Sequence, residues 1–289
     1  MNVYQIVTNR ILEEMEKGCV PWKKPWMSMR MQSGAYNRIT KRPYSILNQL
    51  LLQHEGEYAT IRQWNQLGGT IKKGGKSEIV VFWKMQKFEE KKENGEVEEK
   101  NIPLLRYYRV FHISEVEGVT PLPQPDFFES IGIEEGDEVI RDYEEREHIA
   151  IREIISDRAY YSLSRDQIII PNRHQYEDLH EFYSTTYHEM VHSTGHPSRL
   201  DRGLSQDFFG SDTYSKEELV AEIGAAMLMR TVGIDTESSL KNSASYINGW
   251  MQQIRKDERL VVSAAAKAEK AVRYILGNVD EDISVDNSV

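Results

Sequence analysis

The chain of 289 residues, with a hydrophobic fraction of 39% and a formal net charge of −10, is long enough for two ordinary domains with real cores. A single cysteine excludes an internal disulfide framework. The lack of a long apolar run or signal sequence excludes a membrane or secreted protein, so we expect a cytoplasmic location with no membrane partner. Residues 1–120 carry 19 Lys and Arg against 14 Asp and Glu, whereas residues 121–289 carry 17 against 32, which indicates different partners for the two parts.

The fold class expected is α+β with two domains, and residues 1–119 are predicted to form the first, an α+β domain. Apolar residues recur at helical spacing over 3–17 and 45–53, and a short helix is expected over 61–67. Beyond residue 70 the pattern alternates, which predicts strands over 79–83 and 104–113. The acidic stretch 89–100, with Asn94-Gly95 at its centre, is predicted to be the tip of the hairpin that joins them.

Aromatic and cationic residues are interleaved along this predicted domain. Aromatic rings stack on unpaired bases while cations follow the phosphates, so the combination predicts a surface for single-stranded DNA. For each aromatic residue the alternative is core packing, because aromatic side chains are the largest core fillers. The residues concerned are Trp22, Lys23, Lys24, Trp26, Tyr36, Arg38, Lys41, Arg42, Tyr44, Lys72, Lys73 and Lys76, with Trp83 and Tyr107 as further aromatics.

Three prolines at alternating positions within residues 120–126 predict an extended linker and a domain boundary. A mainly helical domain is expected over 127–278, followed by an acidic disordered tail over 279–289. Residues 127–156 are expected to be mostly helical, and residues 159–163 and 167–171 to form a hairpin. A strand edge of this hairpin, next to the helix that follows, is where a peptide can bind by strand addition.

The stretch 186–193 contains the motif His-Glu-x-x-His within a helix predicted over 178–192. Residues four apart share one face of a helix, so His188 and His192 can bind one metal ion together. Glu189 then lies close enough to take a proton from a metal-bound water, which is the role of a general base in a zinc peptidase. The alternative is a surface helix with two solvated histidines.

A catalytic zinc needs a third protein ligand and one open position. The downstream candidates are His196, Glu217, Glu218 and Glu222. In a helix expected over 214–229, Ser215 stands three residues before Glu218, so Glu218 is either a capping-box residue or a ligand. We predict Glu218 as the third ligand and Glu222 as the partner that orients a histidine, with the order of the two left open. Zn²⁺ is the expected ion, although two imidazoles and a carboxylate also suit Mn²⁺ or Co²⁺.

These motifs resemble those of the ArdC-type antirestriction proteins and the related TraC-type plasmid primases. The resemblance covers Pro-Trp-Lys-Lys-Pro-Trp at 21–26, Tyr-Asn-Arg at 36–38, Lys-Lys-Gly at 72–74, and the stretches 188–202, 214–225 and 242–250. It implies an N-terminal single-stranded-DNA-binding domain and a C-terminal zincin-like metallopeptidase domain. Such proteins are carried by plasmids, conjugative elements and phages, and they shield entering DNA from restriction inside the bacterial host. Ser45 departs from the family, where a glycine is expected, and the acidic insert 89–100 alters the predicted DNA face.

Three hypotheses follow. The chain is an antirestriction-type protein of a mobile element that binds single-stranded DNA, or a zinc endopeptidase that cleaves a host or element-encoded protein. Alternatively, its metal site only stabilises the fold. The first two are compatible, with DNA as the partner of the first domain and a protein or peptide as the substrate of the second.

Overall fold

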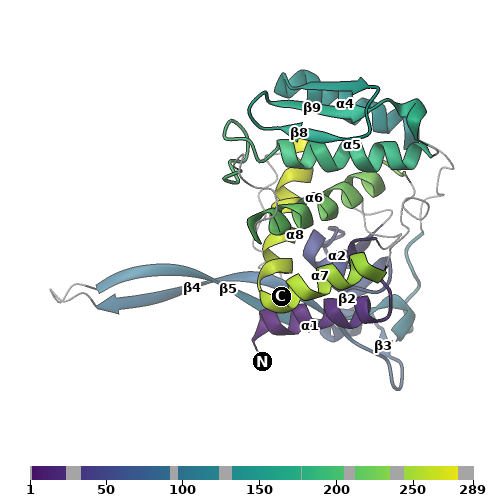
Figure 1. Ribbon diagram of the computed structural model, residues 1–289. Coiled ribbons are helices and arrows are strands. Elements are labelled where there is room, and N and C mark those ends of the chain that lie inside the picture. The colour runs from purple at the N-terminus through teal and green to yellow at the C-terminus, as the bar shows by residue number, and fades with distance from the viewer. Residues whose placement is uncertain are drawn as a thin grey trace.

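A computed structural model describes residues 2–23, 34–91, 97–123, 132–176, 178–204, 212–234 and 244–278. The N-terminal part lies at the lower end of the molecule in Figure 1 with the last helices of the chain beside it, and a long two-stranded arm leaves the body from the N-terminal part. Among the described helices, none is both long and apolar enough to cross a membrane.

The N-terminal part combines short helices with a mixed sheet, as the alternation of patterns predicts. Its four-stranded sheet has the order β1-β2-β5-β4, with β1 parallel to β2 and the other pairs antiparallel. A small second sheet pairs β3 with β6. The elements are α1 (Val3–Glu16), the 3-10 turn η1 (Pro21–Lys23), β1 (Ala35–Asn37), α2 (Ile46–Leu51), β2 (Gly56–Ala59), α3 (Ile61–Gln66), β3 (Thr70–Ile71), β4 (Glu78–Lys91), β5 (Val97–His112), η2 (Ile113–Glu115) and β6 (Val116–Glu117).

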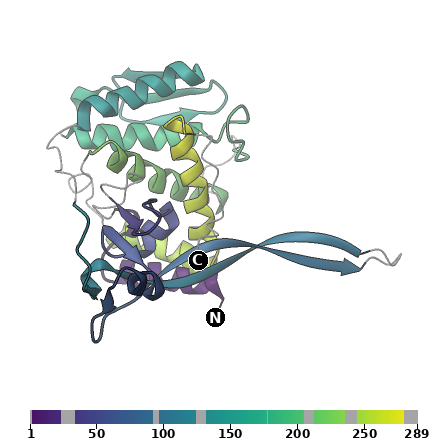
Figure 2. The same ribbon diagram turned by 180° about the vertical axis from the view of Figure 1, so that it is seen from behind.

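The arm is formed by β4 and β5, which pair from Glu78↔Val110 to Lys91↔Val97. Val81 and Leu105 at its root are buried in the main core, whereas the outer part leaves the body as a twisted ribbon (Figures 1 and 2). The predicted hairpin is therefore present, and both of its strands are longer than the sequence pattern indicates. The turn itself, with Asn94 and Gly95, lies outside the described residues.

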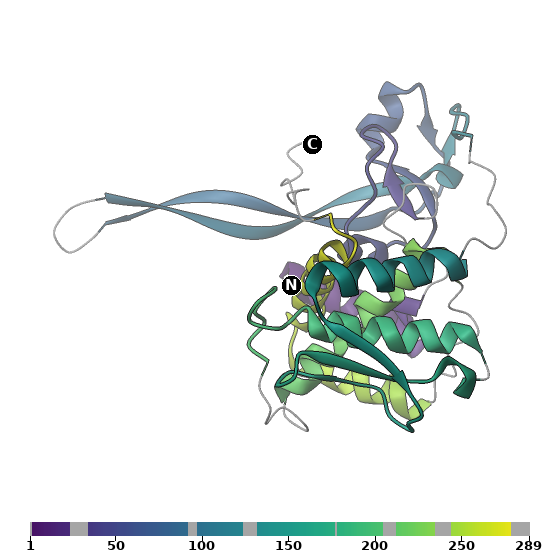
Figure 3. The same ribbon diagram turned by 90° about the horizontal axis from the view of Figure 1, so that it is seen from above.

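The C-terminal part is mainly helical, as predicted, with one three-stranded sheet at its end (Figure 3). The sheet has the order β7-β9-β8, so β8 is an edge strand. The predicted hairpin is β8–β9, which pairs antiparallel. The elements are α4 (Gly132–Glu147), β7 (Ala150–Ile154), β8 (Tyr160–Ser162), β9 (Gln167–Pro171), η3 (Arg173–Gln175), α5 (Leu179–Ser193), α6 (Asp212–Thr231), α7 (Ala244–Lys256) and α8 (Leu260–Ile275).

Most of the described residues within 127–156 are helical, as predicted, but the sequence does not predict strand β7 at the end of this range. Helix α4 ends at Glu147, and His148 takes a left-handed conformation with φ 53°, which turns the chain back. The Ile151 N–H then donates to Glu144 Oε1 at 3.0 Å, and β7 runs parallel to β9. Parallel pairing with a strand more than ten residues away leaves little signal in the local sequence.

The motif helix is α5, close to the predicted span, and Asp178 caps it by accepting from the His180 N–H. Helix α6 begins earlier than predicted, at Asp212. Ser215 therefore lies inside the helix rather than at its N-cap, so the capping-box alternative for Glu218 does not hold. The carboxylate of Glu218 is therefore not used to cap α6 and can contact a ligand.

One hydrophobic core joins the N-terminal helices to the C-terminal ones. Val7 and Ile11 of α1 and Ile46 of α2 belong to the same buried cluster as α6 and α8. The buried carboxylate of Glu269 on α8 accepts the Ile46 N–H at 3.0 Å, so a C-terminal residue satisfies a backbone donor in the first turn of α2. The described part of the predicted linker is irregular and anchored to the N-terminal part, because the Leu122 N–H donates to Glu57 Oε1 at 2.6 Å.

Candidate metal centre

Three predicted ligands meet where α5 and α6 lie side by side (Figure 1). The Nε2 atoms of His188 and His192 are 3.1 Å apart, and carboxylate oxygens of Glu218 lie 3.4 Å from His188 Nε2 and 3.1 Å from His192 Nε2. Zinc–ligand bonds of about 2.1 Å place tetrahedral ligands about 3.4 Å apart. The three donor atoms therefore have the spacing of a metal site before any side chain moves.

Helices α5 and α6 pack closely, and this brings the side chains of His188, His192 and Glu218 together. Met190 and Val191 of α5 are fully buried on the side facing the core. A Cβ atom built on Gly224 of α6 would lie only 2.8 Å from Val191 Cγ2, so a glycine is required where α6 passes α5. Glu217 is seven residues before Gly224 and shares its helix face, which directs the start of α6 toward the histidines.

Glu217, rather than the predicted Glu222, lies behind a histidine. Its Oε1 is 3.6 Å from His192 Nδ1, the ring nitrogen that faces away from the cluster. The Arg202 Nε donates to both carboxylate oxygens of Glu217 at 3.1 Å, so the buried acid has a fixed orientation. Glu222 lies one helical turn beyond Glu218, and its carboxylate makes no ion pair with either motif histidine in the described structure.

The charges of the cluster favour a cation. Burial lowers the pKa of His192, but the carboxylates of Glu217 and Glu218 beside its two ring nitrogens outweigh burial and raise that pKa to about 10. Burial raises the pKa of Glu217 and of Glu218, yet their histidine contacts, with Arg202 beside Glu217, hold both pKa values below the ordinary range. The carboxylates are thus ionised at neutral pH, and a divalent ion can replace the proton that they hold on the imidazole.

Glu189 is held at the edge of the neighbouring sheet. Its side chain is buried, and its Oε2 accepts the Tyr161 backbone N–H at 2.8 Å. Tyr161 belongs to β8, so the expected strand edge does lie beside the motif helix. Oε1 has no hydrogen-bond partner among the residues that the structure describes, which leaves this oxygen able to accept a proton.

Two arginines secure the turn that follows α5. The buried Arg199 donates to the Ser193 carbonyl at 2.8 Å and forms an ion pair with Asp166, while Arg202 donates to the Val191 carbonyl at 2.7 Å. Sequence reasoning missed both arginines, although each follows the motif closely and lies in the same stretch that carries the family resemblance. His196, a candidate ligand, instead bonds Ser198 Oγ through Nδ1 at 2.6 Å and is not part of the cluster.

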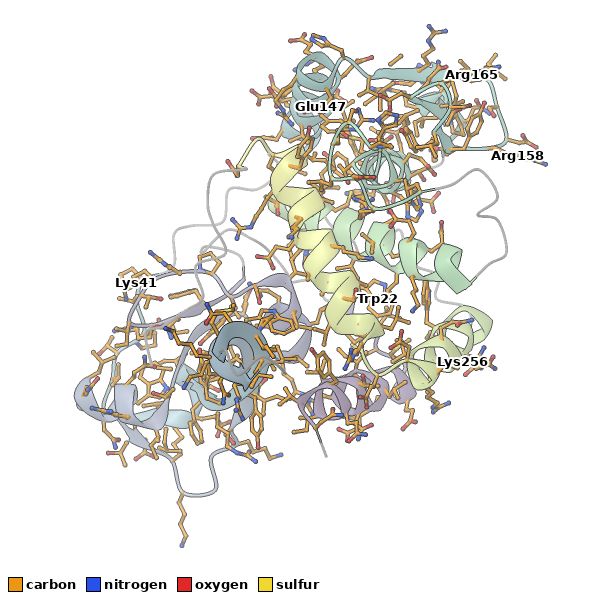
Figure 4. The ribbon with its side chains drawn as sticks, turned by 90° about the vertical axis from the view of Figure 1, so that its left-hand side faces the viewer. Trp22, Lys41, Glu147, Arg158, Arg165 and Lys256 are labelled. Carbon is orange, nitrogen blue, oxygen red and sulfur yellow. The ribbon has the colours of Figure 1, made fainter. Side chains whose placement is uncertain are left out.

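Three of the aromatics predicted to stack on DNA are core residues. Trp22 is 1% exposed and packs edge-on against Trp250, with ring centroids 6.2 Å apart, inside the helical body (Figure 4). Tyr36 and Tyr44 are each 7% exposed. For these three the core alternative fits the burial. Trp22 packs against a C-terminal helix, whereas Tyr44 packs edge-on against Tyr58 within the N-terminal part. Lys24, Trp26 and the side chain of Lys23 lie outside the described residues.

The predicted cations are divided between two turns. Lys41 and Arg42 are exposed in the turn after β1, and Lys41 extends from the N-terminal part in Figure 4. The second turn, between β3 and β4, exposes Lys72, Lys73 and Lys76. Arg38 differs from the others, because it is half-buried and forms an ion pair with Glu57.

Comparison with known proteins assigns both halves of the chain. Residues 1–111 match the family model for the N-terminal domain of anti-restriction factor ArdC, and residues 140–267 match a zincin-like metallopeptidase model. The metal-free crystal structure of the antirestriction protein ArdC from plasmid R388 is 31% identical in sequence, with a TM-score of 0.75 over 96% of this chain and 98% of that one. The Mn(II)-bound structure of the same protein is 30% identical, with a TM-score of 0.74 over 98% and 100%.

A longer relative shares the same region. DNA primase TraC of Escherichia coli is 30% identical over 298 residues, which are 94% of this chain and only 27% of TraC. The chain therefore spans about a quarter of that protein. The match to ArdC extends over nearly the whole of both chains and includes the metal-centre helices. This chain belongs to the ArdC family of antirestriction proteins.

Proposed function

We propose that the chain is a mobile-element antirestriction protein with a metal-dependent peptidase site, acting in the cytoplasm of a bacterial host. The observation that carries the proposal is the convergence of His188, His192 and Glu218 beside Glu189. Two imidazoles and one carboxylate are a ligand set of catalytic zinc sites, which keep a fourth position open. The crystal structure of the R388 relative with Mn(II) bound supports a divalent ion as the cofactor of this chain.

The residues of the chain divide the work as follows. His188, His192 and Glu218 would hold the ion, with Zn²⁺ proposed and Mn²⁺ or Co²⁺ also suited to the donors. When bound, the ion supplies Lewis-acid activation of water and of a carbonyl group. Glu189 acts as the general base through Oε1, while the Tyr161 N–H fixes Oε2. The outer edge of β8 offers backbone groups to an extended peptide.

The test separates metal binding from chemistry. Zn²⁺ binding is measured by calorimetry on the wild type, Glu189→Gln and His192→Ala, and hydrolysis is followed with fluorescein-labelled casein. We expect Glu189→Gln to bind Zn²⁺ like the wild type and to lose hydrolysis, and His192→Ala to lose both. If both the wild type and Glu189→Gln bind Zn²⁺, melt at the same raised temperature and show no hydrolysis, the ion only stabilises the fold.

We infer in addition that single-stranded DNA binds at the root of the arm. Tyr107 is 43% exposed on β5, and Arg109 lies two residues further on the same strand face. Arg109 donates to Ser77 Oγ at 2.9 Å, which places it next to the turn that carries Lys73 and Lys76. An exposed ring among cations is suited to stacking on a base while phosphates are neutralised.

The DNA test uses a fluorescent single-stranded oligonucleotide at two salt concentrations. Tyr107→Ala should lower affinity by about 1–3 kcal/mol, the usual contribution of one stacked base. Lys73→Ala should weaken binding and lower the salt dependence by about one phosphate contact. Arg62→Ala, an exposed arginine on α3 that is not among the predicted DNA contacts, is the control and should bind as the wild type does. Salt-insensitive binding, or none, would remove the basis of this proposal.

A further inference from the structure

The arm has an open edge along β4. At its root, the Val81 N–H donates to Asn48 Oδ1 at 2.7 Å, and the Val81 carbonyl accepts from Asn48 Nδ2 at 2.9 Å. Val81 therefore points its main-chain groups away from β5, and so do Trp83 and Met85, because these groups alternate in direction along an antiparallel strand. The main-chain groups of Trp83 and Met85 have no hydrogen-bond partner among the described residues. Beyond Val81, this edge of β4 is open.

The other edge of the arm is blocked by a proline. Pro103 on β5 is opposite Met85 in the register, so it also occupies a position whose main-chain groups point outward. A proline has no N–H to donate there, and prolines on edge strands hinder pairing with another strand. The β4 edge is therefore the one that can accept a further strand.

Apolar side chains are exposed on both faces of the arm outside its root. Met85 is 48% exposed and Ile102 is 41% exposed. Met85 pairs with Pro103 and Ile102 with Gln86, and side chains of neighbouring pairs point to opposite faces. A two-stranded ribbon is marginally stable in water by itself, and this one extends away from the body (Figures 1 and 2). Further strands would stabilise it and cover these side chains.

Charge is distributed unevenly along the arm. The sequence of its outer end, residues 88–100, carries six acids against three bases. The inner parts, residues 78–87 and 101–110, carry one acid against four bases. Of these bases, Lys84 and Arg106 are exposed and form no ion pair with any residue that the structure describes. Two arms side by side in opposite directions would bring the acidic end of each beside the basic root of the other. A second copy of the chain is therefore an electrostatically complementary partner.

We propose that the arm mediates self-association, in which the β4 edges of two copies pair antiparallel about a two-fold axis and the two ribbons form one four-stranded sheet. Asn48 ends the pairing at Val81, and residues 83–91 of each β4 are available beyond it. The same contacts form twice across the axis. This self-association does not depend on the metal centre or on hydrolysis.

The experiment measures the mass of the full chain by sedimentation velocity over a range of protein concentrations. We expect the wild type to dimerise. Met85→Pro removes an outward N–H without breaking a bond to β5, and it should weaken dimerisation at least about tenfold. Asn101→Pro, at an outward position on the blocked β5 edge, is the matched control and should dimerise like the wild type. The double change Lys84→Glu with Arg106→Glu should weaken the dimer, and so should added salt.

Hydrogen exchange then locates the contact. The N–H groups of Trp83 and Met85 should exchange more slowly at a protein concentration where the dimer dominates than where the monomer does. A wild type that stays monomeric at every concentration would overturn the proposal, as would a Met85→Pro protein that dimerises normally. Protection of these N–H groups only after a single-stranded oligonucleotide is added would also overturn it, because DNA would then cover the edge. Equal melting temperatures of the two proline variants verify that both fold.

Discussion

Glu217 on α6 faces His192 on α5 from behind, with its Oε1 3.6 Å from Nδ1, while Nε2 of the same ring faces His188 and Glu218. An acid at Nδ1 favours the tautomer whose Nε2 lone pair points at a metal, and it increases the basicity of the ligand. Arg202 keeps this acid ionised and oriented, so the turn after the motif helix contributes to the metal centre.

Replacing Glu217 tests this relationship. Glu217→Gln should lower Zn²⁺ affinity by about 10- to 100-fold, the usual effect of losing such a partner. Affinity is measured by competition with a chromophoric chelator. Glu222→Gln, on the same helix, is the matched control and should bind Zn²⁺ as the wild type does. If the two variants bind equally, Glu217 does not position His192.

Replacing Trp22 tests whether this side chain stabilises the core, as its burial indicates, or lies on the surface where it could contact DNA. Trp22→Ala should reduce the free energy of unfolding by about 3–5 kcal/mol, because a fully buried ring is lost. Tyr107→Ala should change stability by no more than about 0.5 kcal/mol, because Tyr107 is a surface residue. Urea denaturation of both variants gives the comparison. A Trp22→Ala protein of wild-type stability would contradict the packing of Trp22 against Trp250.

Gly224 tests the contact between α5 and α6. Gly224→Val should cost about 1–3 kcal/mol of stability and weaken Zn²⁺ binding, because the new side chain meets Val191 and forces the helices apart. Gly249 on α7, where an added Cβ would meet nothing within 4 Å, provides the control substitution Gly249→Ala. Full Zn²⁺ affinity in Gly224→Val would show that ligand spacing does not depend on this contact.

The Asp166–Arg199 pair predicts a pH dependence of stability. Burial raises the pKa of Asp166, but hydrogen bonds from Arg199 and Tyr161 outweigh it and hold that pKa below its ordinary value. A lowered folded-state pKa gives stability that is present above the unfolded value and is lost as pH falls through the folded one. Thermal denaturation between about pH 7 and pH 3 should therefore show a smaller acid-induced loss in Asp166→Asn than in the wild type. Asp157→Asn should retain the wild-type pH profile.

The sequence predicts the parts of the site that depend on local periodicity. His188, Glu189 and His192 lie on one helix, and the spacing of its apolar residues predicts that helix. Glu218 is predicted as a ligand because its helix brings acids into an otherwise apolar face, and the structure places its carboxylate beside both histidines. Whether Glu217 or Glu222 faces His192 depends on how α6 packs against α5. Gly224 permits this close packing, but the sequence alone does not show that Gly224 contacts Val191.

Long-range packing accounts for what the sequence does not predict. Trp22 and Tyr44 stand among cations in the sequence, which is typical of a surface that stacks on bases, and only their tertiary contacts show that they are buried. Strand β7 is stabilised by pairing with β9, and β9 is separated from β7 in the sequence by a loop and by strand β8. The sequence predicts only the parts of β4 and β5 nearest the body, residues 79–83 and 104–113, because the alternation of side chains is strongest there.

The carboxylate of Glu269 that accepts the Ile46 N–H, together with the shared core around α1, α2 and α8, has an evolutionary consequence. Recombination within the proline-rich connection would exchange one sequence domain for another, but both domains contribute residues to the same hydrophobic core. A chimera between two relatives would inherit mismatched side chains along α1 and α8, and the Ile46 N–H of α2 would lose its carboxylate partner where Glu269 is replaced. The halves of this protein are therefore expected to diversify as a coadapted pair, with compensating changes on both sides of the connection.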